Sequence, residues 1–262
     1  MKLHWLKLAM SLALAGPVWA QDVAQGTGQP VETESEAGKK VEVSAVKNPA
    51  LRPYRIMTRG LDAFDKHHAL APNAGLRFEL WNADGSIPQP NGLGLRLAGD
   101  NTDLALPVDA DATFILPRNQ EALDDNADLV LNRKKEQMGW RPRVRSPGVP
   151  EGARRLGDMR LECEVSWAVM KDQVSFVLRT AMSAVGGMCH SPMTALWYRA
   201  PKRLVSATLV SGERSRPLTL NAGGDSFIVP VRAKEWDNES LIVYRFADAA
   251  APEPAVAAPA AP

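Results

Sequence analysis

The sequence predicts a mainly β protein with two immunoglobulin-like or prealbumin-like β-sandwich modules and a short helix in a central insert. Two observations predict this fold class. Short runs of alternating apolar and polar residues, separated by turn residues, fill residues 75–132 and return in residues 196–246. The two regions also resemble each other at a spacing of 113 residues, as in DATFILP and GDSFIVP. This similarity favours internal duplication. The alternative is that two unrelated β-sandwiches use similar strands and glycine turns.

The chain begins with the pattern of a Sec-type signal peptide. Two lysines precede an apolar run, residues 8–18, that is too short to span a bilayer. Small residues occupy the first and third positions before Gln21, where cleavage is expected. Residues 1–20 are therefore predicted to be removed. The mature protein is expected in the periplasm or outside the cell, without a membrane span.

Two terminal segments are predicted to be disordered. Residues 21–50 are polar and poor in aromatic side chains, and residues 248–262 form an Ala/Pro-rich tail. Loss of the two signal-peptide lysines reduces the 31 basic residues to 29, against 30 acidic residues. This balance gives no overall attraction to nucleic acid, and none is expected as a partner.

Residues 51–132 are expected to form the first module. Every second residue from Leu93 to Leu97 is leucine, and glycine-containing turns follow. Phe114 in this module and Phe227 in the second are each followed directly by an isoleucine, and a proline comes two residues after that isoleucine. The two rings are therefore expected at matching core positions of their modules.

Residues 133–157 are basic, rich in proline and glycine, and without a period, so we expect a long surface connection. Arginine is suited to bidentate recognition of anions, and long loops often carry binding sites. An envelope protein or an anionic envelope component is the expected partner. The alternative is a solvated loop whose arginines pair with Glu136 and Glu151. The candidate binding residues are Arg141, Arg143, Arg145, Trp140, Arg154 and Arg155.

Residues 158–247 are expected to form the second module, beginning with a strand–helix insert. Apolar and charged residues alternate over 158–169, which predicts a strand. Residues 172–185 predict a helix with Asp172 as N-cap and an apolar stripe that includes Val177 and Leu178.

The only two cysteines, Cys163 and Cys189, fall on the predicted strand and just after the predicted helix. An even number of cysteines in an oxidising compartment favours a disulfide. A catalytic cysteine is disfavoured, because adjacent residues such as Cys189 and His190 diverge in an extended segment.

A copper-handling protein is an alternative function. Thioether and imidazole groups suit Cu(I), and the candidate ligands lie in two short segments. A bridged Cys189 would not be available, and neither segment has zinc-site spacing. The alternative ligands are Met188, His190, Met193, His67 and His68.

No recognisable enzyme motif occurs. The sequence has no GxSxG, P-loop or GxGxxG pattern and no calcium loop. We therefore expect a non-enzymatic binding or scaffolding protein of the cell envelope, without a cofactor. An envelope hydrolase that lacks a familiar motif is the remaining alternative.

Overall fold

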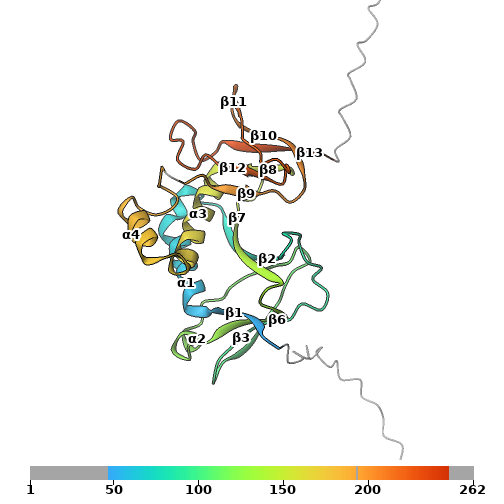
Figure 1. Ribbon diagram of the computed structural model, residues 1–262, viewed down its shortest axis with the longest axis vertical. Helices are drawn as coiled ribbons and strands as arrows, with labels where there is room; N and C mark the ends of the chain where they lie inside the picture. Colours follow the sequence, from blue (N-terminus) through green and yellow to red (C-terminus); the bar gives the residue numbers. More distant parts are fainter. Residues whose placement is uncertain (1–46, 193, 248–262) are drawn as a thin grey trace, which may run out of the picture. The chain divides into compact units, whose positions relative to one another are not determined.

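The computed structural model describes residues 47–247 except 193, and this part of the chain is mainly β with several antiparallel sheets (Figure 1). The expected signal peptide, residues 1–20, lies outside the described residues, as do the tail 248–262 and most of the polar segment 21–50.

The first half of the described chain, residues 49–145, forms two antiparallel sheets. One sheet has the strand order β1-β6-β3-β4 and the other has the order β5-β2-β7. β1 begins at Pro49, inside the segment predicted to be disordered. The elements are β1 (Pro49–Pro53), α1 (Tyr54–His67), the 3-10 helix η1 (His68–Leu70), β2 (Gly75–Asn82), β3 (Leu95–Ala98), β4 (Asp103–Leu106), β5 (Thr113–Phe114), α2 (Gln120–Asp124), β6 (Asp128–Lys134) and β7 (Met138–Arg145).

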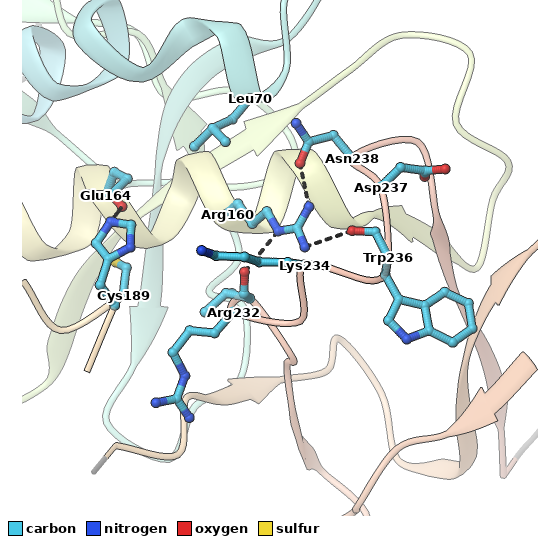
Figure 2. Close-up of a pocket in the computed structure, with 11 residues that line it drawn as sticks. Leu70, Arg160, Glu164, Cys189, Arg232, Lys234, Trp236, Asp237 and Asn238 are labelled. Atoms are coloured by element: carbon cyan, nitrogen blue, oxygen red, sulfur yellow. Dashed lines mark hydrogen bonds and ion pairs between the residues drawn. The ribbon is translucent and has the colours of Figure 1, made fainter. Parts of the chain in front are cut away.

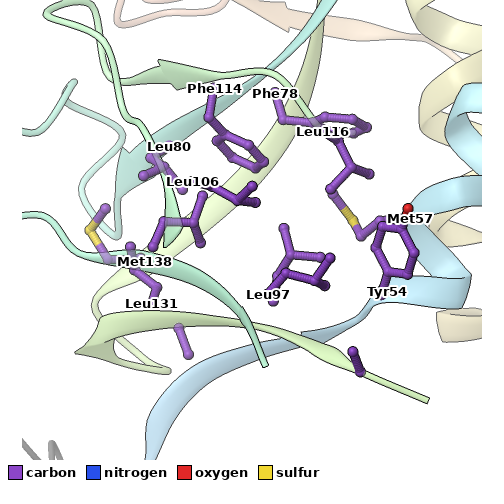
Figure 3. Close-up of a cluster of buried hydrophobic side chains, with 14 of the residues drawn as sticks. Tyr54, Met57, Phe78, Leu80, Leu97, Leu106, Phe114, Leu116, Leu131 and Met138 are labelled. Carbon is purple, nitrogen blue, oxygen red and sulfur yellow. The ribbon is translucent and has the colours of Figure 1, made fainter. Parts of the chain in front are cut away.

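One buried apolar cluster draws its side chains from both of these sheets (Figure 3). Phe78 and Phe114 stack with ring centroids 5.7 Å apart, and Leu97 reaches the same cluster from the other sheet. Tyr54, the first residue of α1, is fully buried, and its hydroxyl donates to the Pro117 carbonyl at 2.6 Å. The start of the helix is thereby fixed to the segment after β5.

The second half, residues 153–246, also has two antiparallel sheets, with the orders β11-β10-β13-β8 and β12-β9. Its second apolar cluster includes Phe227, Leu209 and Ile242. The elements are β8 (Ala153–Arg155), α3 (Leu156–Met170), the 3-10 helix η2 (Lys171–Gln173), α4 (Phe176–Ala184), β9 (Trp197–Arg199), β10 (Leu204–Ser211), β11 (Arg214–Pro217), β12 (Ser226–Ile228) and β13 (Leu241–Phe246).

The two halves share a strand order. The series β1-β6-β3-β4 corresponds to β8-β13-β10-β11, and β5-β2 corresponds to β12-β9. In each half a helix follows the first strand of the series. The first residue of this helix donates its backbone N–H to the residue just before the second strand of the series, β6 or β13. Tyr54 donates to Ala127 at 2.9 Å, and Leu156 donates to Ser240 at 2.8 Å. Within the described residues, β7 has no counterpart in the second half.

The strand predicted over residues 158–169 is wrong, because this segment belongs to helix α3. α3 packs against both α1 and β7 and is buried on nearly every side. Such a helix has no single apolar stripe, and its buried residues include Glu162 and Glu164, so its sequence alternates like a strand. Gly60 of α1 permits the close packing, since Val169 Cγ2 lies 2.8 Å from where a Cβ would stand.

The long surface connection expected over residues 133–157 is largely strand. β7 pairs with β2 along its whole length, from Met138 opposite Asn82 to Arg145 opposite Gly75. Proline and a run of arginines both suggest a loop, and they concealed this strand in the sequence.

The predicted insert helix is present as α4, but it begins later than expected. Ser175, not Asp172, is the N-cap, and its hydroxyl accepts from the Leu178 backbone N–H. The apolar stripe is not a buried face, because Val177 is 77% exposed and Met182 is the buried residue of this helix.

Cys163 of α3 and Cys189 after α4 lie at disulfide distance, with the sulfurs 2.06 Å apart, as the sequence predicts. Replacing both cysteines with serine is expected to lower the free energy of unfolding by about 3.5 kcal/mol, the chain-entropy value for a loop of this length. Urea denaturation measures the change. As a control, reductant should lower the wild-type midpoint and leave that of the double variant unchanged. Equal midpoints for wild type and variant would contradict a stabilising bond.

Candidate functional site: an arginine-lined cavity

Side chains of both halves line a cavity of about 180 Å³, which we call the arginine cavity. Two carboxylates, of Glu79 and Asp111, also line it. The cavity wall holds more guanidinium groups than carboxylates, which makes it a candidate site for an anion. Its arginines are Arg141, Arg143 and Arg145 of β7, Arg154 of β8 and Arg199 of β9.

Strand alternation brings three of these arginines together. Successive side chains of a strand point to opposite faces, and in β7 the even-numbered positions face the core. Pro142 and Val144 are buried, and Trp140 packs edge-on against Phe114 with centroids 5.9 Å apart. Trp140 therefore does not belong to the arginine cavity, contrary to its predicted role beside the arginines.

The guanidinium groups differ in how their charge is balanced. Arg141 forms a bidentate pair with Glu79, at 2.9 and 3.1 Å, and Arg143 contacts Asp111 at 2.6 Å. Arg145 donates to the Ala153 carbonyl at 3.3 Å and has no carboxylate partner among the described residues.

The electrostatic environment of Arg145 favours an added anion. Arg145 is exposed to solvent as a whole residue, and partial burial of its guanidinium lowers its pKa, as do the positive charges of Arg154 and Arg143. Tyr244, which also lines the cavity, has its pKa raised to about 12 by burial, so its phenol stays neutral at physiological pH. A bound anion would offset the mutual repulsion of the arginines.

Arg154 is the most deeply buried of the five arginines, with 5% of its surface exposed. It pairs with Glu162 of α3 at 2.8 Å and donates to the Tyr198 hydroxyl at 3.1 Å. Burial is the largest single influence and acts to lower the pKa of Arg154, but the charge and hydrogen bond of Glu162, together with Tyr244 and Asp158, outweigh it and the pKa is raised. The Arg154 Nε–H has no hydrogen-bond partner in the part of the chain that the structure describes, which leaves a buried donor in a residue of the cavity wall.

The buried carboxylates of α3 also hold β7 in place. Glu162 accepts from the Val144 backbone N–H at 2.9 Å, and Asp158 accepts from the Ser146 backbone N–H at 2.8 Å. The positions of the β7 arginines therefore depend on α3.

Arg155, the last of the predicted binding residues, lies outside the cavity wall. Its guanidinium pairs with Glu239 at 3.1 Å. The structure thus brings four of the six predicted residues together, namely Arg141, Arg143, Arg145 and Arg154. Sequence reasoning missed Glu79, Arg199 and Tyr244, which come from elements far from β7 in the chain.

A second cavity, of about 290 Å³, adjoins the first, and we call it the methionine cavity. It shares Arg141, Tyr198 and Arg199 with the arginine cavity. Its wall is otherwise mainly apolar and includes Met159, Met170 and Met188. Methionine side chains adapt to irregular apolar groups, so this wall can accept varied side chains.

Two of the candidate metal ligands, His67 and His190, meet at Glu164, and the other described candidates lie elsewhere. Met188 lines the methionine cavity, and His68 lies 3.3 Å from the Ala74 carbonyl. His190 Nε2 is 2.8 Å from one oxygen of Glu164, and His67 Nε2 is 3.8 Å from the other. Met193 lies outside the described residues. Within the described part of the chain, no group of three or more His, Cys, Asp or Glu residues is placed to hold a metal ion.

Glu164 and Cys189 belong to a further cavity, of about 630 Å³, which is shown in Figure 2. Arg160 crosses it and donates to the Trp236 carbonyl at 2.9 Å and to Asn238 Oδ1 at 2.5 Å (Figure 2). Because its guanidinium is already satisfied by these acceptors, Arg160 has a structural role.

No helix in residues 47–247, with 193 set aside, is both long and apolar enough to cross a membrane. No family model matches the chain, and no curated protein or solved structure is significantly similar to it.

Proposed function

We propose that this chain is an exported, non-enzymatic binding protein of the bacterial cell envelope, and that the arginine cavity binds an acidic group of its partner. One observation carries the proposal: four of the five arginines in the cavity wall pair with a carboxylate, whereas Arg145 has none among the described residues. The unpartnered Nε–H of buried Arg154 supports it, because buried donors normally find an acceptor.

The proposal includes an architecture and a location. We infer that the two halves are duplicated β-sandwich modules of prealbumin-like type. The shared strand order and the matching backbone hydrogen bonds of Tyr54 and Leu156 support this inference. The disulfide and the sequence of residues 1–20 support export to the periplasm.

Replacing Arg145 with glutamine is expected to weaken anion binding at least tenfold, since a hydrogen bond to a charged group contributes about 1.5–3 kcal/mol. Phosphate is the probe, and its stabilising effect is read as the rise in Tm over sodium chloride at equal ionic strength. Tm without phosphate should change little, because Arg145 holds no ion pair among the described residues.

Arg155→Gln is the matched control, because Arg155 lies outside the cavity and pairs with exposed Glu239. It should keep the full response to phosphate. An equal response in wild type, Arg145→Gln and Arg155→Gln would contradict anion binding in the arginine cavity.

A further inference from the structure

Strand β9 has one paired edge and one open edge. Ala200 donates to the Asp225 carbonyl at 2.8 Å, and Val229 donates to the Leu196 carbonyl at 3.0 Å. In an antiparallel pair the hydrogen-bonding direction alternates from residue to residue. The backbone groups of Trp197 and Arg199 therefore point away from β12. Among the described residues no strand pairs with that edge.

The corresponding edge in the first half is occupied. Leu80 donates to the carbonyl of Ala112, two residues before Phe114, at 2.9 Å. Ala200 likewise donates to the carbonyl of the residue two before Phe227, so Leu80 and Ala200 occupy equivalent positions. The backbone groups equivalent to those of Trp197 and Arg199 belong to Arg77 and Glu79. These two residues lie opposite Arg143 and Arg141 of β7. β7 thus covers in the first half the edge that β9 leaves open in the second.

The open edge is accessible through a cavity. The methionine cavity is lined by four consecutive residues, 196–199. Successive side chains of a strand point to opposite faces, so a cavity on one face would contact only every second residue. Because residues 196–199 all line the methionine cavity, we infer that this cavity runs along the edge of β9. Trp197, at this edge, is half exposed.

We propose that the open edge of β9 binds an extended acidic peptide segment of a partner protein by β-strand addition. This inference rests on the proposed function, because the arginine cavity supplies the charge recognition. Main-chain hydrogen bonds to Trp197 and Arg199 give the affinity, and pockets on the two faces give the specificity.

The two faces of the added strand meet different chemistry. Arg199 lines the arginine cavity, so residues of the added strand on the same face as Arg199 lie beside its guanidinium groups, and acidic side chains suit them. Tyr198 packs against buried Phe227, so residues of the added strand on the same face as Tyr198 lie beside the apolar cluster of the second half, and apolar side chains suit them. β7 has the same alternation, with Val144 inward and Arg143 outward. The preferred segment alternates acidic and apolar residues.

The test uses a fluorescein-labelled peptide of eight residues that alternates glutamate and valine, with Kd measured by fluorescence anisotropy. Two matched peptides separate the contributions. Methylation of alternate backbone nitrogens keeps the charges and removes hydrogen-bond donors, and it should weaken binding at least tenfold. Lysine in place of glutamate should abolish binding.

The matched protein variants are Trp197→Pro and Trp197→Ala. The Trp197 N–H does not face β12, so proline at this edge position removes a donor without breaking the β9–β12 pair. Trp197→Pro should bind the peptide at least tenfold more weakly than Trp197→Ala. If Trp197→Pro does not fold, the methylated peptide still decides the question with wild-type protein.

Each failure has its own reading. The methylated and unmethylated peptides could bind equally well to the wild type, and both could lose binding in the Arg145→Gln variant. This result would overturn strand addition but would still support anion binding in the arginine cavity. If the glutamate peptide does not bind while phosphate still raises the Tm of the protein, strand addition would also be overturned and anion binding would still be supported. Binding only after removal of residues 248–262 would assign the edge to the chain's own tail, and edge-dependent self-association would assign it to a second copy. Both would overturn the proposal.

Discussion

Replacing Phe114 or Phe227 with alanine is expected to lower the free energy of unfolding by about 3–5 kcal/mol in each case. Both rings are 0% exposed. Phe114 contacts Phe78 and Trp140, and Phe227 contacts Tyr198 and Tyr244, with centroids 6.0 Å apart or less. Each substitution removes a large apolar surface and leaves a space that neighbouring aromatic rings fill only in part.

Urea denaturation of the single variants measures these losses. Ile115→Ala is the control beside Phe114, because Ile115 is 61% exposed, and its effect should stay within about 0.5 kcal/mol. A loss below 1 kcal/mol at either phenylalanine would contradict the equivalence of the two positions. Similar losses at both would support duplication of the modules.

Glu162→Gln is expected to lower the free energy of unfolding by about 3–5 kcal/mol, because it leaves the Arg154 guanidinium buried without a counter-charge. It also weakens the acceptor for the Val144 backbone N–H, which holds β7 against α3. Chemical denaturation gives the change in stability, and the phosphate response reports whether the arginine cavity keeps its geometry.

Two controls locate the cause of this loss. The double variant Arg154→Met/Glu162→Leu removes both charges and should recover much of the stability. Glu239→Gln breaks the more exposed pair with Arg155 and should cost about 0–1 kcal/mol. If Glu162→Gln and Glu239→Gln had equal effects, burial would not set the strength of the Arg154–Glu162 pair.

The sequence predicted much of the fold because strands leave a local pattern. Alternation and turn residues indicated the β character of both halves. The similarity at a spacing of 113 residues predicted that Phe114 and Phe227 lie in the cores, and both are buried. α3 was mistaken for a strand for a physical reason. Two of its buried residues are acidic: Glu162 accepts a hydrogen bond from β7, and Asp158 accepts one from Ser146 just after β7. Periodicity does not reveal such partners.

The candidate site could be predicted in part. The arginines of β7 were visible as a local cluster, and strand alternation would have separated Trp140 from Arg141 had β7 been predicted as a strand. Arg199 and Tyr244 could not be found in this way, since they reach the cavity only through the packing of the second half against the first.

The place of α3 in the molecule has an evolutionary consequence. α3 belongs to the second half by chain order, yet its carboxylates hold the last strand of the first half. If the halves arose by duplication, these contacts make each half depend on the other. A first half without α3 would leave Val144 and Ser146 without their acceptors, and a second half without β7 would leave Glu162 and Asp158 without these donors. Each half therefore supplies hydrogen-bond partners that the other half needs.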